Sequence, residues 1–303
     1  MRTMIMRTVI ARAVIGTLAL AGLGLAGGAQ ADDFGPQPAP AVAQSFNVGQ
    51  LQLTVLQDAR FVVANDGKTF GVDADPAAVT QVLKSAGAPT DRITLSVDVL
   101  LLRTGARVLL FDTGLGPQLH GGLLASLKQA GVAPAAVTDV LITHPHMDHI
   151  GGLVTAAGTA AFPQAAIRMP EAAWAWMQQQ SPQISQAIAG QVHTFKPGAE
   201  LAPGVRSVPL AGHTPGHTGY EIVSGGERLL DIGDLAHSSI VSLAKPQWTV
   251  GFDEDAASGK ATRLAELAAL AKSGERVFAP HFPFPGVGRI KTQGDGFAWQ
   301  AGQ

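Results

Sequence analysis

The 303-residue sequence contains no cysteine, which excludes disulfides and thiolate metal ligands. Any metal site in this chain therefore uses only nitrogen and oxygen donors. Charged residues are also few, at 15%, and the formal net charge is −2. This balance gives no electrostatic reason to expect a nucleic acid or an anionic lipid as a partner. The hydrophobic content of 46% is ample for a sizeable core.

No apolar run after residue 31 is long enough to span a membrane. Before it, three arginines precede the apolar stretch from Ala13 to Ala26, and Ala29-Gln30-Ala31 follows. This order predicts a secretory signal peptide over residues 1–31, and hence a periplasmic or secreted protein with no membrane contact after cleavage. The alternative is an uncleaved membrane anchor, for which the run is short and rich in glycine. Loss of the three arginines brings the net charge to −5.

Residues 32–45 are rich in proline and alanine and are predicted to be a flexible lead-in to one domain over residues 46–303. From residue 46 onward, alternating patterns predict strands, including separate strands over 51–56 and 61–63. Amphipathic stretches predict helices over 76–85, 117–130 and 256–272. Each half contains a hairpin whose second strand ends on an aspartate, Asp112 or Asp234. We therefore predict an internal duplication at the level of the fold.

Six consecutive residues, H-P-H-M-D-H, run from His144 to His149 after a predicted buried strand over 137–143. Three imidazoles and a carboxylate in six positions indicate metal ligands. His144 and His146 stand two apart at a strand end, so their side chains point the same way and can bind one cation. Asp148 and His149 follow where the chain turns, and can face a second cation.

Two sites in one loop require further ligands, and His213, Asp234 and His281 each follow a predicted strand. For His281 the alternative is a tight turn, because prolines flank the His-Phe pair. Five histidines and two aspartates suit two divalent cations, with zinc favoured and manganese, iron or cobalt as alternatives.

The motifs T-H-P-H-M-D-H-I-G-G, G-H-T-P-G-H-T and G-D-L and the last histidine resemble, in order, the signature of the metallo-β-lactamase superfamily of hydrolases. The resemblance implies an α/β fold, a four-layer αββα sandwich with two pseudo-equivalent halves and a dinuclear site between its sheets. It assigns to one metal His144, His146 and His213, to the other Asp148, His149 and His281, and to both Asp234 as a bridge. It also implies that Asp112 orients a ligating histidine, for which a strand-end cap is the alternative.

Two bound cations imply hydrolysis by a bridging hydroxide, with Asp148 placed to orient it and pass its proton. The segments F-P-Q-A-A-I-R and H-F-P-F-P-G-V-G-R-I resemble the methyl parathion hydrolase branch, which cleaves aryl phosphotriesters. That branch lines its pocket with aromatic residues, for which the candidates here are Trp174, Trp176, Phe282 and Phe284. For the two tryptophans, packing on a helix face is the alternative.

The loops carry fewer aromatic residues than that branch, so the substrate stays open among small-molecule phosphotriesters, lactones and aryl esters. Acyl-homoserine lactonases often have a tyrosine three residues after the bridging aspartate, where this chain has His237. An imidazole can still donate a hydrogen bond, so His237 is a second catalytic candidate, and His217 is expected to support the ligands. A non-catalytic periplasmic metal-binding protein is the remaining alternative, and a homodimer is left open.

Overall fold

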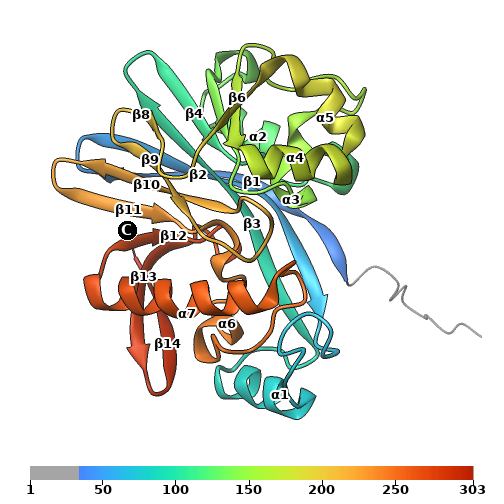
Figure 1. Cartoon of the computed structure of the whole chain (residues 1–303), viewed down its shortest axis with the longest axis vertical. Coiled ribbons are helices and arrows are strands. Elements are labelled where there is room, and N and C mark those ends of the chain that lie inside the picture. The colour runs from blue at the N-terminus through green and yellow to red at the C-terminus, as the bar shows by residue number, and fades with distance from the viewer. Residues whose placement is uncertain (1–33, 303) are drawn as a thin grey trace, which may run out of the picture. The chain divides into compact units, whose positions relative to one another are not determined.

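The computed structural model describes residues 34–302, so the predicted signal peptide lies outside the described residues (Figure 1). Fourteen strands form two sheets of seven, and each sheet is built from one half of the chain. The first sheet has its strands in sequence order: β1 (Gly35–Val48), β2 (Leu51–Ala64), β3 (Arg92–Thr104), β4 (Arg107–Phe111), β5 (Asp139–Leu141), β6 (Ala166–Pro170) and β7 (Val192–Phe195).

The second sheet has its strands in the reverse order, from β14 to β8. Its strands are β8 (Glu200–Ala202), β9 (Val205–Pro209), β10 (Thr218–Ser224), β11 (Glu227–Asp231), β12 (Arg276–Phe278), β13 (Val287–Gln293) and β14 (Gly296–Ala301). The helices are α1 (Pro76–Ser85), α2 (Leu123–Gln129), α3 (Met147–Ile150), α4 (Glu171–Gln180), α5 (Pro182–Ile188), α6 (Val241–Ala244) and α7 (Ala256–Ser273).

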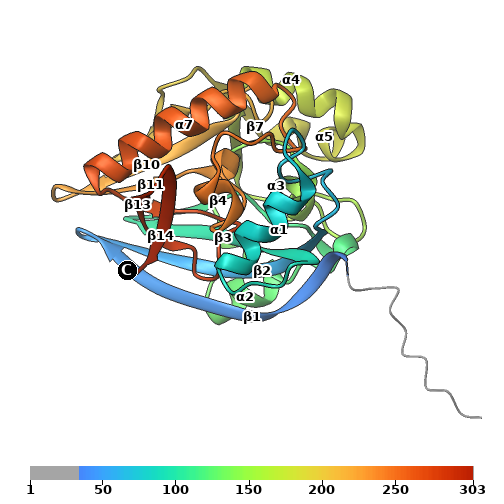
Figure 2. The same cartoon turned by 90° about the horizontal axis from the view of Figure 1, so that it is seen from below.

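Three buried apolar clusters separate four layers, because the central strands are apolar on both faces. In β3, Leu101 packs with α2 and α4 on the outer face, while Leu100 and Leu102 pack between the sheets. In the second sheet, Leu229 faces the same inter-sheet core and Leu230 packs with α7. Figure 2 shows α7 and α2 on opposite sides of the paired sheets. The predicted αββα sandwich is thus confirmed.

The two halves use the same strand order around their centres. An antiparallel hairpin, β3-β4 or β10-β11, is followed by a strand parallel to its second arm, β5 or β12. The parallel pairs β4-β5 and β11-β12 each send their carboxyl ends toward the loops that carry the predicted ligands. The predicted duplication is therefore visible in the topology.

The flexible lead-in predicted for residues 32–45 is wrong, because strand β1 begins at Gly35 and pairs with β2. Proline lacks a backbone N–H, which favoured a linker, but β1 is an edge strand and its outer side needs no donor. The register shifts between Pro38 and Val42, so the proline-rich stretch is accommodated at an irregularity of that edge.

The separate strands predicted over 51–56 and 61–63 are one strand, β2. Its register with β3 passes from Gln57↔Asp98 to Ala59↔Val97, so Asp58 is the extra residue of a β-bulge. A bulge re-aims a side chain, and here it turns Asp58 toward the loop after β4. Among the described residues, no helix has the length and hydropathy to cross a bilayer.

Candidate metal centre

The loops at the carboxyl ends of the central strands bring all seven predicted metal ligands together. The loop after β5 runs directly into α3 and supplies four of them, because α3 begins at Met147 inside the H-P-H-M-D-H motif. The loops after β9, β11 and β12 supply one each. These residues fall into two groups, each of which could hold one cation: His144, His146, His213 and Asp234, and Asp148, His149 and His281.

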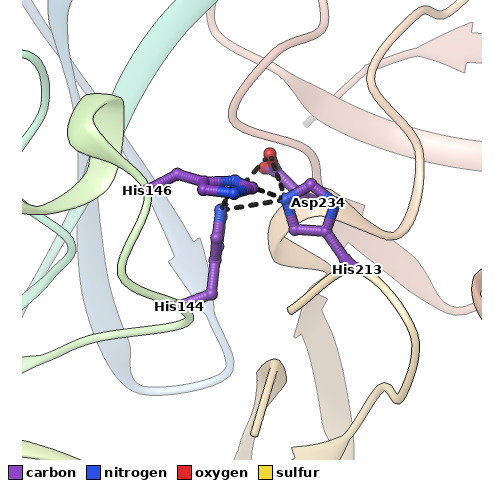
Figure 3. Close-up of side chains that lie close together, drawn as sticks. All are labelled: His144, His146, His213 and Asp234. Atoms are coloured by element: carbon purple, nitrogen blue, oxygen red, sulfur yellow. Dashed lines mark hydrogen bonds and ion pairs between the residues drawn. The ribbon is translucent and has the colours of Figure 1, made fainter. Parts of the chain in front are cut away.

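The first group converges on one point (Figure 3). His213 Nε2 lies 3.1 Å from His144 Nε2 and 2.9 Å from His146 Nδ1, and those two nitrogens are 3.1 Å apart. Three mutually close ring nitrogens cannot all act as donor and acceptor to one another. Their spacing is close to the separation of about 3.3 Å between nitrogen ligands of a tetrahedral zinc ion.

Asp234 connects the two groups through its two oxygens. Oδ2 lies 3.3 Å from His213 Nε2 and 3.5 Å from His144 Nε2, whereas Oδ1 lies 3.2 Å from His149 Nε2 and 3.0 Å from His281 Nε2. The side chain is 3% exposed, and Oδ1 is buried with no hydrogen-bond partner. A buried carboxylate with one oxygen toward each group has the position of a bridge.

Three of the ring nitrogens that face outward have an oxygen acceptor. His213 Nδ1 lies 3.0 Å from Asp253 Oδ1, His149 Nδ1 lies 2.8 Å from Asp112 Oδ2, and His281 Nδ1 lies 2.7 Å from the Ser96 carbonyl. Each acceptor takes the Nδ1–H, which leaves Nε2 to face the centre. This is the usual support for imidazoles that bind a metal.

A fourth imidazole is supported through a hydroxyl. Thr143 Oγ1 donates to Asp112 Oδ2 at 2.7 Å and lies 3.0 Å from His144 Nδ1, so it accepts the His144 proton. Asp112 therefore orients His149 directly and His144 through Thr143. It does so with φ of 63°, a left-handed conformation that Asp tolerates better than most residues.

His217 supports the bridging carboxylate. Its Nδ1 donates to the Leu210 carbonyl at 2.7 Å, and its Nε2 accepts the backbone N–H of Asp234 at 3.1 Å. Gly233 makes this possible, since a Cβ there would lie 2.7 Å from His217 Nε2. His217 thus ties the end of β9 to the Asp234 loop.

The charges of the cluster suit divalent cations. Burial lowers the pKa of His281, but Asp234 and Asp148 outweigh it and raise the pKa to about 9. Burial likewise opposes ionisation of Asp234, yet the surrounding imidazoles hold its pKa well below the usual range. The carboxylates thus stabilise positive charge in the cluster, which protonated imidazoles supply in the absence of metal. Because an imidazole must be deprotonated to bind a metal, a bound cation would supply that charge instead. Donor set, spacing and the orphaned Oδ1 all fit two metal ions.

A cavity of about 330 Å³ opens directly over the cluster. His146, Asp148, Asp234 and His281 lie at its base. Its walls are mostly apolar and consist of Phe61, Leu95, Leu115, Leu119, Met147 and Phe252, with Glu254 also in its lining. A second cavity of about 410 Å³ shares Leu115, Leu119 and Met147 with it and is also mainly apolar.

None of the four aromatic residues predicted for the pocket lines the cavity over the cluster. Phe282 is fully buried beside α7, and Phe284 packs against the inter-sheet core. Trp174 packs against the outer core, and Trp176 meets His146 edge-on with ring centroids 5.6 Å apart. The aromatic residues that line this cavity are instead Phe61 and Phe252, which come from segments that carry no ligand motif.

His237 lies in the wall of the cavity, with Nε2 3.1 Å from Asp234 Oδ2. Its ring is 1% exposed and stacks on that of His281, with centroids 5.8 Å apart. Neither ring nitrogen has a hydrogen-bond partner of good geometry among the described residues. His237 is therefore a buried polar group available beside the ligands.

Sequence reasoning missed two aspartates that shape the site. Asp253 accepts from His213, and Asp58 accepts the backbone N–H groups of Leu115 and Leu123, both at 2.8 Å. Neither follows a motif. The one signal for Asp58 is a carboxylate inside an otherwise strand-like pattern, and Asp253 has none.

Comparison with known proteins identifies related structures. The chain has a TM-score of 0.81 and 27% identity to a structure titled AidC, a dizinc quorum-quenching lactonase with the product N-hexanoyl-L-homoserine, over 87% of this chain and 98% of that one. It has a TM-score of 0.78 and 29% identity to a hydrolase titled AbOPH, over 86% and 97%.

Among curated proteins, the chain is 35% identical over 119 residues to metallo-beta-lactamase domain-containing protein 1 of Xenopus laevis, which is 39% of this chain and 43% of that protein. It is 26% identical to YobT of Bacillus subtilis (strain 168), over 58% of this chain and 78% of that protein. A family model described as the metallo-beta-lactamase superfamily matches residues 92–281, well over half of the sequence. The chain therefore belongs to the metallo-β-lactamase superfamily.

Proposed function

We propose that this protein is a dinuclear metal-dependent hydrolase of ester-type bonds, and that lactones with an apolar acyl group are its main substrate class. The observation that carries the proposal is Asp234, which turns one oxygen to each of two donor groups at the base of an apolar cavity. Cations held by these groups, zinc in the first place, would supply the Lewis acidity that activates water and polarises a carbonyl.

Two side chains are placed to act on the substrate and its proton. Asp148 is 25% exposed and lines the cavity, with its oxygens 3.6 Å from His281 Nε2 and 3.8 Å from His149 Nε2. It is the carboxylate that can accept a proton from the attacking water and pass it to the leaving alkoxide. His237 faces the same space and can bind a substrate oxygen through a ring N–H.

The apolar walls favour a substrate with a hydrocarbon part. Leu115, Leu119 and Met147 lie between the cavity over the cluster and the second apolar cavity. An acyl group that enters past these residues would bury apolar surface at about 25 cal/mol per Å². The likeness to a lactonase bound to N-hexanoyl-L-homoserine supports this class.

Aryl phosphotriesters are a second candidate class. Phe61 and Phe252 line the cavity and offer two rings on which an aryl leaving group can stack. The motifs that resemble the methyl parathion hydrolase branch agree with this chemistry. Two rings give less stacking surface than a pocket lined throughout by aromatics, so we rank this class second.

The test is a substrate panel with the zinc-reconstituted protein: acyl-homoserine lactones of increasing chain length, an aryl phosphotriester and an aryl ester. We expect the highest kcat/KM for the lactones, rising with chain length. Leu119→Gln should raise KM for a hexanoyl lactone about fivefold, because a half-buried leucine contributes roughly 1 kcal/mol. Leu124→Gln, at a leucine that is 49% exposed, is the matched control and should change nothing.

Two results would contradict the proposal. A phosphotriester hydrolysed faster than every lactone would reverse the ranking of the two classes. Two bound zinc ions with no hydrolysis of any panel member would favour a non-catalytic metal-binding protein.

A further inference from the structure

His213 is held by a charged pair buried beneath the metal centre. Asp253 Oδ1 lies 3.0 Å from His213 Nδ1, and its other oxygen accepts from Arg263 at 2.8 Å and 3.2 Å. Arg263 also donates through Nε to the Pro246 carbonyl at 3.3 Å. Both charged side chains are 1% exposed, and Arg263 is the largest fully buried side chain of the described residues.

The backbone around this pair is also fixed to the ligand loop. The N–H of Glu254 donates to the His213 carbonyl at 2.9 Å, and the N–H of Asp255 donates to the Gly212 carbonyl at 2.9 Å. A Cβ at Gly212, where φ is 120°, would lie 1.9 Å from the backbone nitrogen of Gly259 in α7. The first turn of α7 is therefore packed directly against the loop that carries His213.

The same short segment also forms part of the substrate cavity. Phe252 lines the cavity over the cluster, Asp253 turns the other way to His213, and Glu254 lines the cavity again. Arg263 comes from the middle of α7 and donates to Asp253, the residue of this segment that faces His213. A shift of Asp253 would thus move both a ligand and a wall of the cavity.

A buried ion pair is costly, because desolvation offsets most of its Coulomb attraction. A neutral acceptor would satisfy the His213 N–H without that cost, as the Ser96 carbonyl does for His281. Asp112, which supports His149, forms no ion pair with a lysine or arginine of residues 34–302. The guanidinium is therefore a specific feature of the His213 side of the centre.

We propose that Asp253 and Arg263 are a positioning pair for His213 that sets the affinity of one of the two metal sites. The carboxylate fixes the ring so that Nε2 faces His144 and His146, and the guanidinium fixes the carboxylate and balances its charge. Loss of the pair weakens the ion held by the His144, His146 and His213 group and leaves the ion of the other group bound. This inference rests on the metal-binding part of the proposed function and on no substrate.

The experiment measures zinc affinity of the full chain by competition with a chromophoric chelator, which resolves the two ions without substrate. Asp253→Asn should weaken one ion roughly 10- to 100-fold, as loss of such supporting partners typically does, and leave the other within about threefold. Arg263→Lys keeps the charge without the paired geometry and should give a smaller loss at the same ion. Lys260 lies on the same helix as Arg263 and forms a partly exposed ion pair with Asp73. Lys260→Met removes that pair and should leave both zinc affinities unchanged.

The double variant Asp253→Asn with Arg263→Met separates positioning from a purely structural role. Either single substitution, Asp253→Asn or Arg263→Met, leaves one buried charge without its partner. The double variant has no such charge, so its free energy of unfolding, measured in urea on the metal-free protein, should exceed that of either single variant. Zinc affinity at the one site should remain low. Wild-type affinity at both sites in the double variant would overturn the inference, as would equal loss of both ions in Asp253→Asn. A wild-type chain that binds no zinc would instead overturn the proposed function and this inference together.

Discussion

The two halves of the chain build the metal centre in different ways. In the first half, one loop after β5 supplies His144, His146, Asp148 and His149, and thus reaches both donor groups. In the second half, three separate loops supply one residue each, and only Asp234 contacts both groups. Local backbone geometry therefore brings the first-half ligands together, and Asp112 orients two of them. The second half gathers its ligands from distant loops, and there the supporting contact of His213 is the buried ion pair of Asp253 with Arg263.

The largest effect is expected from substitution of Asp234, the residue that joins the two donor groups. Asp234→Ala should reduce zinc affinity at both sites and lower kcat/KM by more than roughly 100-fold, the upper end for residues that only support a ligand. Asp148→Ala, which removes a carboxylate from one group, should weaken one ion and lower kcat while leaving the first group intact. Chelator competition and steady-state kinetics measure both effects. Two ions retained at wild-type affinity in Asp234→Ala would refute the bridging assignment.

The sequence was informative where function depends on neighbours along the chain. The H-P-H-M-D-H cluster and the histidine or aspartate after each later strand predicted the residues that the fold gathers, because a strand end fixes where its next side chains lie. The hairpins ending on Asp112 and Asp234 predicted the duplicated topology for the same reason. Strand and helix patterns with period near 2 and 3.6 predicted the individual elements. The four-layer arrangement was predicted only through the resemblance of the motifs to the metallo-β-lactamase superfamily.

The sequence was uninformative where function depends on partners distant along the chain. Asp253 supports a ligand 40 positions earlier, and Asp58 holds a loop 57 positions later. The cavity walls were mispredicted because Phe282 and Phe284 adjoin a ligand in sequence but turn into the core. The proline-rich strand was missed because composition does not reveal that β1 is an edge.

A smaller effect on zinc affinity is expected from Thr143→Val, which distinguishes the two histidines that Asp112 orients, His144 and His149. Thr143→Val keeps the side-chain size but removes the hydroxyl between Asp112 and His144, while the direct contact of Asp112 with His149 remains. We expect a loss of about 1 to 2 kcal/mol, hence roughly 5- to 30-fold in zinc affinity, at the His144 group alone. Thr138→Val, at a threonine on the opposite end of β5, is the control. Equal weakening of both ions would show that Thr143 also sustains Asp112 itself.

The smallest effect on activity is expected at Asp58, which touches neither group. Its carboxylate accepts the N–H groups of Leu115 and Leu123, and an asparagine amide keeps only one of these bonds. Asp58→Asn should therefore loosen the loop that carries Leu115 and Leu119 and raise KM for a long-chain lactone a few-fold, with both zinc affinities unchanged. A loss of zinc from this variant would mean that the loop supports the metal centre and not only the cavity wall.

The stability of the same variant has a distinct pH dependence. Burial raises the pKa of Asp58 from 3.8 to about 6, so the folded state takes up this proton before the unfolded state does. The cost of its buried charge is therefore present above about pH 6 and is relieved as the pH falls toward 4. We compare the free energies of unfolding in urea of the two proteins after chelator treatment. As the pH falls from 7 to 4.5, that of the wild type should rise relative to that of Asp58→Asn by up to about 2 kcal/mol. Parallel pH profiles for the two proteins would mean that Asp58 stays charged in the fold, balanced by its two backbone donors.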